Sequence, residues 1–395
     1  MEQFVSSAFV LVKSALDGQK YMLPPETDYE RLYNFGRQMQ ILPLLYAGIE
    51  NCAAELPAGL RERFEKFAVQ AFLFSTKQWT LLQSVCAAFE LGKIDYMPLK
   101  GTLLKELYPS PEMRMMSDAD ILIRVEQYPR IREIMIDLGF TENIESDHEL
   151  FWKKNGFVIE LHKRLIPSYN KDYYAYFGEG WQRAVRVSPD EYRYRMSDED
   201  AYVYLLTHFA KHFRDGGIGP RHFIDFFVYR QKKELDAAYL DEQFDKLKLR
   251  EFNDHLVTAI DWLFANGAPD SVSEYLLERI CHSGPYGDSE LRRISAALKD
   301  QKRSGSFAAG YRRRLFGRFF PPLAAMQSMY PALKHRPFLL PFFWVARWFS
   351  LVFLRHHTKE YYQRVFEKNE RQVAAYENEL KKIGLDYSFE HGEND

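Results

Sequence analysis

The sequence has little cysteine and no excess of charge of either sign. Its three cysteines, Cys52, Cys86 and Cys281, lie far apart and are odd in number, which favours reduced thiols over a disulfide framework. Lys and Arg total 53 against 55 Asp and Glu, so no overall basic field attracts nucleic acid. Glu2 stands where a secretory leader would carry basic residues. We therefore expect a cytoplasmic protein without a strong nucleic-acid signature.

Long apolar runs are also lacking, apart from one stretch near the C-terminal end. Residues 338–354 are mostly Phe, Leu, Val and Trp, but a bilayer crossing needs about 20 apolar residues. Arg347 stands near the middle of the run, where insertion of a charge costs about 2.5–3.5 kcal/mol. We expect a helix packed within the C-terminal region. The alternative is a peripheral contact, in which this helix lies on an anionic membrane surface.

What the sequence does contain is enough apolar material for two or three packed domains: 46% hydrophobic and 16% aromatic residues in a chain of 395. Residues 1–92 show the apolar spacing of helices, residues 93–190 alternate strand and helix patterns, and helical spacing resumes in 191–305 and 306–395. We expect an α+β fold, in which a small mixed β-sheet core is flanked by N-terminal and C-terminal helical regions.

Two aspartates at positions i and i+2 begin an apolar run that is typical of a strand. Asp118 and Asp120 precede Ile121, and alternate residues of a strand share a face. Neighbouring carboxylates repel each other unless a cation lies between them, and oxygen ligands of this kind suit Mg²⁺. The pair predicts a metal site for phosphoryl or nucleotidyl transfer. The alternative is a pair of solvated aspartates in a turn.

Polar residues on either side of Asp118 and Asp120 help to decide between a metal site and a pair of solvated aspartates. Upstream, Lys100 and Gly101 join a short apolar run to a helix pattern, and glycine at such a turn lets backbone N–H groups approach a phosphate. Downstream, Glu160 becomes a third carboxylate if its strand lies beside the aspartates, and otherwise faces solvent. Arg114 offers a forked donor to a phosphate, or pairs with an aspartate and fixes the loop. Ser117 would order the turn before the strand.

A helix pattern further along the chain carries a second group of polar residues. His208, Lys211 and His212 share one helix face, and Arg221 follows a glycine-rich turn that suits an anion. We expect these residues to line a nucleotide cleft. The alternative is that they bridge helices or pair with nearby aspartates. Zinc is not expected, because no cysteine lies nearby and Phe209 occupies the place of the glutamate in the zinc-protease pattern.

In this order and spacing, the motifs resemble the DNA-polymerase-β-like nucleotidyltransferase superfamily, and more closely its bacterial family of uncharacterised nucleotidyltransferases. The resemblance covers residues 90–230 and rests on five motifs: Leu99-Lys100-Gly101, Arg114-x-x-Ser117-Asp118-x-Asp120, Glu160-Leu161-His162, His208-x-x-Lys211-His212 and Arg221-x-x-x-Asp225. Superfamily members commonly carry Gly-Ser at the first turn, where this chain has Lys100-Gly101.

The resemblance implies that Asp118, Asp120 and Glu160 hold one or two Mg²⁺ ions, with Mn²⁺ as the alternative. It implies transfer of a nucleoside monophosphate from a nucleoside triphosphate, such as ATP, to a hydroxyl acceptor with release of pyrophosphate. Glu160 would assist deprotonation of the hydroxyl, and residues 191–305 would close the cleft. The implied contacts to the nucleotide or its phosphates are Lys100, Gly101, Arg114, Ser117, His208, Lys211, His212 and Arg221.

Two questions stay open at the level of sequence. The acceptor is RNA, a protein or a small molecule, and nothing in the residues chooses among them. The departure at Lys100-Gly101 also leaves a second function open: a catalytically degenerate protein that binds a nucleotide or a partner, attached to a polysaccharide or peptide biosynthesis pathway.

Overall fold

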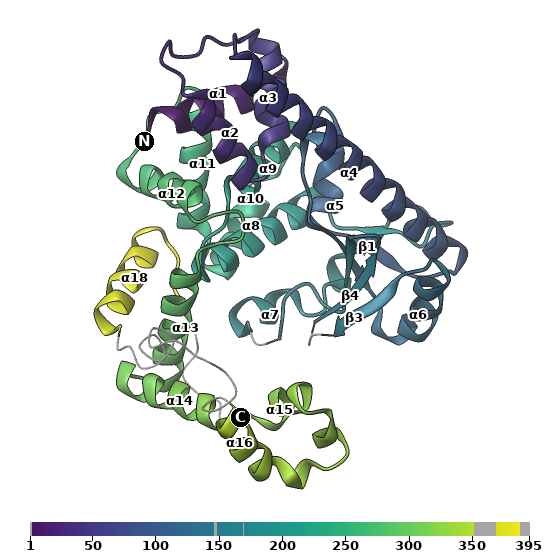
Figure 1. Ribbon diagram of the computed structural model, residues 1–395. Helices are drawn as coiled ribbons and strands as arrows, with labels where there is room; N and C mark the ends of the chain where they lie inside the picture. Colours follow the sequence, from purple (N-terminus) through teal and green to yellow (C-terminus); the bar gives the residue numbers. More distant parts are fainter. Residues whose placement is uncertain (1, 146–147, 169, 351–368, 388–395) are drawn as a thin grey trace. The chain divides into compact units, whose positions relative to one another are not determined.

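The computed structural model describes residues 2–145, 148–168, 170–350 and 369–387, and the chain divides into two compact units (Figure 1). The first unit comprises Met1–Asp288 with Lys382–Leu385, and the second comprises Ser289–Lys381 with Asp386–Asp395. The first unit contains the sheet and every residue of the candidate site.

Four helices precede the sheet, as the apolar spacing of the N-terminal region predicts. They are α1 (Gln3–Asp17), α2 (Tyr29–Gln38), α3 (Leu42–Cys52) and α4 (Ala58–Leu91). A Cβ on Gly48 of α3 would lie 2.1 Å from the carbonyl oxygen of Leu11 in α1, so the close packing of these two helices requires glycine. The C-terminal part of α4 packs on the sheet through Leu82, Val85 and Phe89.

A mixed five-stranded sheet follows and confirms the predicted α+β fold. Its strands lie in the order β1-β2-β5-β4-β3; β2 and β5 are parallel, and the other neighbouring strands are antiparallel. Their bounds are Tyr96–Pro98 (β1), Asp118–Ile123 (β2), Thr141–Glu145 (β3), Glu149–Lys154 (β4) and Phe157–His162 (β5). The sequence does not predict β3, because its segment Thr-Glu-Asn-Ile-Glu lacks apolar alternation.

The alternation of side chains along β2 and β5 divides the sheet into an apolar and a polar face. Ala119, Ile121 and Ile123 of β2 belong to one core cluster with Ile159 and Leu161 of β5. Residues of α4 and of α6 (Tyr128–Asp137) complete this cluster on the apolar face (Figure 1). The residues between these positions face the opposite way. Burial of the apolar set therefore also determines which polar side chains meet on the other face.

A buried ion pair fixes the connection between β1 and β2. This connection contains α5 (Lys100–Leu104) and the 3₁₀ turns η1 (Lys105–Leu107) and η2 (Pro111–Met113). Arg114 donates from Nε and Nη2 to the two carboxylate oxygens of Asp225, at 2.9 and 2.7 Å. Tyr108 donates to the same carboxylate at 2.8 Å. The side chains of Arg114 and Asp225 are 4% and 5% exposed, so the pair has little contact with water.

Helices form most of the remaining first unit. Its further elements are η3 (Val125–Gln127), α7 (Lys171–Phe177), η4 (Trp181–Arg183), β6 (Val185–Arg186), β7 (Tyr194–Arg195), α8 (Asp198–Arg214), α9 (Pro220–Lys232), α10 (Ala237–Leu247), α11 (Arg250–Phe264) and α12 (Ser271–His282). Ser197 caps the N-terminus of α8, because its Oγ accepts a hydrogen bond from the backbone N–H of Asp200. Pro220 opens α9 at the position where proline is favoured.

The second unit is helical where the structure describes it. Its elements are α13 (Ser289–Ser304), α14 (Phe307–Phe319), α15 (Leu323–Met329), η5 (Pro331–Lys334), η6 (Pro337–Leu339), α16 (Leu340–Phe349) and nearly all of α18 (Glu370–Lys382). α16 has no fully buried residue, but one of its sides packs within this unit: Trp344 and Trp348 donate to backbone carbonyl oxygens just after and at the end of α14. The expectation of a helix packed within the C-terminal region therefore holds for one side of the described part of 338–354. Residues 351–354 lie outside the described residues. Among the described residues, no helix combines the length and the hydropathy needed to cross a membrane.

Removal of one partner of the buried ion pair should destabilise the first unit strongly. Asp225→Asn leaves the Arg114 charge buried without its counterion, and we expect a loss of about 3–5 kcal/mol in the free energy of unfolding, measured by urea denaturation. The double variant Arg114→Met/Asp225→Leu should recover most of this loss. The exposed pair of Arg130 and Glu133 supplies the control, Glu133→Gln, which should change stability by less than about 1 kcal/mol. Equal losses in Asp225→Asn and in the control would contradict the assigned role of the pair.

Candidate functional site

The parallel pairing of β2 and β5 brings three carboxylates to the polar face of the sheet. Asp120 is the register partner of Glu160, and Asp118 lies two residues before Asp120 on the same face. Asp118 is also close enough to Glu160 for the two side chains to affect each other's pKa. The three acids that the sequence analysis singled out are therefore neighbours in space, although up to 42 residues separate them along the chain.

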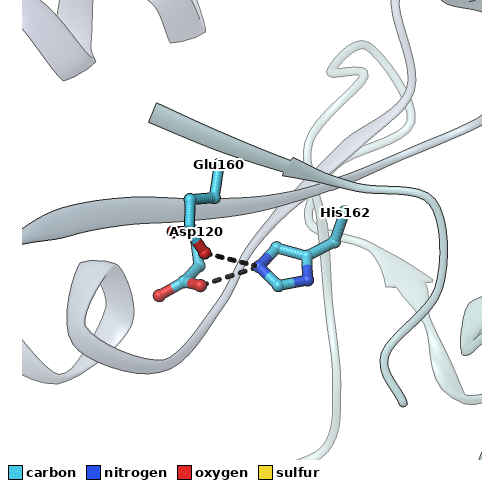
Figure 2. A group of neighbouring side chains, drawn as sticks. All are labelled: Asp120, Glu160 and His162. Carbon is cyan, nitrogen blue, oxygen red and sulfur yellow. Dashed lines mark hydrogen bonds and ion pairs between the residues drawn. The ribbon is translucent and has the colours of Figure 1, made fainter. Parts of the chain in front are cut away.

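His162 joins this cluster, and the sequence analysis did not assign it a role. Its Nε2 lies 2.7 Å from Asp120 Oδ1 and 3.8 Å from Glu160 Oε2 (Figure 2). Asp120, Glu160 and His162 each offer one ligand atom, and these atoms lie within 4.8 Å of one another. The signal for His162 was available, because Glu160-x-His162 repeats on β5 the spacing of Asp118-x-Asp120 on β2.

A further carboxylate on β4 lies behind the imidazole. Glu149 Oε1 lies 3.6 Å from His162 Nδ1 and 2.8 Å from His148 Nε2. Burial would raise the pKa of Glu149, but the hydrogen bond with His148 and the charge of His162 outweigh it and lower this pKa to about 2. Glu149 is therefore an anion that lies beside the His162 ring, at ion-pair distance from Nδ1.

Lys100 supplies the nearest positive charge. Its Nζ donates to Asp120 Oδ1 at 2.8 Å, and the backbone N–H of Asp120 donates to the hydroxyl of Thr102 at 3.2 Å. The start of α5 is held against β2 by these bonds. Gly101 is glycine for a steric reason: a Cβ there would lie 2.5 Å from Arg114 Nη1. The structure thus explains Gly101 by the close approach of Arg114, whereas the sequence analysis expected the approach of a phosphate.

The three carboxylates carry more negative charge than their surroundings neutralise. Burial would raise the pKa of Asp120, but the charge of Lys100 and the hydrogen bond with His162 hold it well below its usual range. Burial and the charge of Asp120 raise the pKa of Asp118. Burial, followed by the charges of Asp120 and Asp118, raises the pKa of Glu160 to about 9. At neutral pH, Glu160 therefore keeps its proton unless a further cation joins the cluster.

Histidines of α8 and α9 form a second polar group. His208 and His212 of α8 place their Nε2 atoms 3.1 Å apart, and the ring of His222 in α9 is centred 6.5 Å from that of His208. Burial and the charge of Lys100 hold the pKa of His208 well below its usual range. Burial and the charge of Arg221 do the same for His222. His208 and His222 are thus neutral donors or acceptors, and His222 was not among the residues expected from the sequence.

The expected residues Arg114, Ser117 and Arg221 hold the segment that precedes β2. Arg114 is engaged by Asp225, which is the structural pairing that the sequence left as an alternative. Arg221 is buried and donates from Nη1 to Gln40 Oε1 at 2.7 Å and to the carbonyl oxygen of Met115 at 2.9 Å. Ser117 shares a hydrogen bond with the hydroxyl of Tyr286. Lys211 lies on α8, one turn beyond His208 and beside His212 in sequence.

A cavity of about 270 Å³ lies beside Lys100. Its apolar lining includes Met97 and Leu99, and the backbone N–H of Leu99 donates to the carbonyl oxygen of Asp120 at 3.0 Å. The other walls come from α5, from the segment around β7 and from α8; they include Leu103, Val187, Arg193, Arg195, Met196, Ala201, Tyr204 and Leu205. Burial raises the pKa of Tyr204; the charge of Lys100 lowers this pKa, and the charges of Asp120 and Glu160 raise it further. This tyrosine therefore lies close to both the cavity and the carboxylates.

The chain was also compared with known proteins. Neither the curated proteins nor the solved structures contain a match to it. A protein-family match, described as uncharacterised nucleotidyltransferase, extends over residues 25–265. This range is more than half of the chain and includes the sheet, α8 and α9. The chain therefore belongs to the uncharacterised nucleotidyltransferase family.

Proposed function

We propose that this protein transfers a nucleoside monophosphate from a nucleoside triphosphate to a hydroxyl acceptor and releases pyrophosphate. The observation that carries the proposal is the meeting of Asp118, Asp120 and Glu160 on one face of two parallel strands. Family membership supports nucleotidyl transfer in general. The chemistry needs no covalent nucleophile, because positioning and neutralisation of charge lower the barrier.

The donor set suits a divalent metal ion. Asp118, Asp120 and Glu160 offer the hard oxygen ligands that Mg²⁺ prefers, and burial together with the charges of Asp120 and Asp118 raises the pKa of Glu160, which a bound cation would lower again. His162 adds a nitrogen ligand, which Mn²⁺ accepts more readily than Mg²⁺ does. When bound, such an ion would neutralise the charge that develops on the attacking and leaving oxygens.

Glu160 is the residue best placed to accept the proton of the acceptor hydroxyl. A general base works best when its pKa lies near the working pH, and burial together with Asp120 and Asp118 moves the pKa of Glu160 from 4.5 to about 9. Additional positive charge at the cluster would bring this pKa down toward neutrality. Asp120 is held as an anion by Lys100 and His162, so it would keep its place without exchanging a proton.

The polar face of α8 divides the site into two ends. Ala201, Tyr204 and Leu205 line the cavity, whereas His208, Lys211 and His212 follow on the next turns toward Arg221. In-line transfer places the attacking hydroxyl and the leaving pyrophosphate on opposite sides of the reacting phosphorus. We assign the histidine end, with Lys211 and Arg221, to the phosphate tail, whereas Lys100, which contacts Asp120 and lines the cavity, would lie at the reacting phosphate. The cavity then takes the acceptor, whose apolar part would contact Met97 and Leu205. Arg114 and Ser117 would act as positioning residues.

One observation favours a second function, the binding of a nucleotide without transfer. Asp120 Oδ1 already contacts both Lys100 Nζ and His162 Nε2, so this oxygen has two partners before any metal ion arrives. A protein that uses Lys100 as a permanent counter-charge would bind a nucleoside triphosphate and release no pyrophosphate.

The substitution Asp118→Asn should distinguish nucleotidyl transfer from nucleotide binding without transfer. Asp118→Asn removes a carboxylate that no lysine or arginine contacts directly in the described site, and we expect pyrophosphate release to fall at least about 100-fold. The assay uses labelled nucleoside triphosphates, Mg²⁺ or Mn²⁺ and a cell extract as the source of acceptors. Glu133→Gln on the exposed face of α6 is the control and should keep full activity. If Asp118→Asn retains wild-type turnover, the transfer mechanism is wrong; if the wild type binds nucleotide but never releases pyrophosphate, the second function is correct.

Repulsion among the carboxylates predicts a pH dependence of stability in the metal-free protein. The pKa of Glu160 rises from 4.5 to about 9 on folding, so its contribution is complete below pH 4.5 and is lost as the pH rises toward 9. When the pH is raised from mildly acidic to mildly alkaline in EDTA, the free energy of unfolding should fall by at least about 1 kcal/mol more in the wild type than in Glu160→Gln. Urea denaturation at both pH values measures the difference. Identical pH profiles for the two proteins would show that Glu160 is not crowded by the aspartates.

Filling the cavity tests where the acceptor binds. Leu205→Trp should lower transfer to acceptors at least about tenfold, because the larger side chain displaces the acceptor from an in-line position. The dissociation constant of the nucleoside triphosphate, measured by calorimetry, should stay within about twofold. Leu91→Trp, at an exposed position of α4, is the control. A variant that loses nucleotide affinity instead would assign the cavity to the nucleoside.

A further inference from the structure

The second unit presents an exposed aromatic face on η6 and α16. Phe338, Phe342, Val345 and Phe349 recur at the spacing that places residues on one side of a helix. Phe338 is 73% exposed, Phe342 72% and Phe349 60%. Phe316 and Phe319 of α14 are also exposed. The side chains of Phe338, Phe342, Val345 and Phe349 are referred to below as the aromatic face.

The opposite side of α16 is held by contacts with the end of α14 and the residues after it. Trp348 Nε1 donates to the carbonyl oxygen of Phe319 at 2.7 Å, and Trp344 Nε1 donates to that of Pro321 at 2.9 Å. The ring of Phe320 contacts both indole rings edge-on, with centroids 5.1 and 5.3 Å away. These bonds fix the rotation of α16 about its own axis. The outward direction of the aromatic face is therefore a consequence of the packing, and not of a loosely attached helix.

The same segment carries positive charge only. Residues 301–350 contain nine Lys or Arg and no Asp or Glu, although the whole chain is balanced at 53 against 55. Several of these cations are exposed, among them Arg312, Arg313, Arg318, Lys334 and Arg336. A partner for this surface must therefore accept large apolar side chains and supply negative charge next to them.

We propose that the aromatic face, with its surrounding cations, docks on the surface of an anionic lipid bilayer. Phenylalanine side chains enter the boundary between headgroups and acyl chains, while Lys and Arg contact lipid phosphates. A second copy of the chain is a poorer occupant, because two such surfaces would bring like charges together. The inference is independent of the proposed transfer reaction, since no residue of the carboxylate cluster takes part.

Vesicle binding tests the apolar part of the proposal. The full chain should sediment with vesicles of phosphatidylcholine mixed with phosphatidylglycerol, and far less with phosphatidylcholine alone. A triple variant of the aromatic face should bind the mixed vesicles at least about tenfold more weakly: Phe338→Ser/Phe342→Ser/Phe349→Ser. The matched control replaces three exposed apolar residues of α4 and should bind like the wild type: Val69→Ser/Phe72→Ser/Leu73→Ser. Circular dichroism checks that both variants fold.

A charge variant tests the electrostatic part of the proposal. It also provides a second test if the aromatic variant does not fold. Arg312→Gln/Arg313→Gln/Arg318→Gln should weaken binding to the mixed vesicles and reduce its dependence on salt. Lys66→Gln/Lys77→Gln on α4 is the control and should leave both unchanged. The proposal is overturned if the wild type ignores anionic vesicles, if it binds neutral ones equally well, or if the aromatic variant binds unchanged. Self-association that is lost in the aromatic variant, without vesicle binding, would assign the face to a second copy.

Discussion

Mutual repulsion of three carboxylates, held together by the parallel pairing of β2 and β5, is the constraint on which the site depends. The alternating apolar residues of the two strands are buried against α4 and α6, and this burial leaves no freedom in register. Asp120 therefore lies beside Glu160 even though the two carboxylates repel each other. Lys100 and His162 offset part of this repulsion, and burial together with the remaining repulsion raises the pKa of Glu160.

The elements around the sheet keep this arrangement in place. The segment before β2 is attached to α9 by the pair of Arg114 and Asp225 and by Arg221, which reaches the carbonyl oxygen of Met115. Glu149 on the neighbouring strand lies 3.6 Å from His162 Nδ1 and adds a negative charge beside the ring. These contacts keep the distances within the carboxylate cluster fixed. In phosphoryl transfer chemistry, such distances determine the rate. Part of what looks like binding machinery in the sequence is thus support for the loop and strand that carry the aspartates.

Local patterns predicted the sheet and its acids well, and long-range contacts poorly. The alternation in Asp118-x-Asp120 and around Glu160 is a property of single strands, so the shared face follows from sequence. The pairing of Arg114 with Asp225 joins residues 111 positions apart, and the role of His222 arises only because α8 and α9 pack together. The cavity likewise combines β1, β7 and α8. Aromatic composition alone did not indicate that one side of the described part of 338–354 is exposed while the other packs against the end of α14.

A crystal structure with Mn²⁺ and a non-hydrolysable nucleoside triphosphate analogue would test the central claim most directly. The account predicts anomalous scattering from Mn²⁺ within bonding distance, about 2.0–2.4 Å, of oxygens of Asp118, Asp120 and Glu160, with the triphosphate extending toward Lys100 and His208. Manganese bound elsewhere, or a nucleotide bound with no metal at these three side chains, would contradict it.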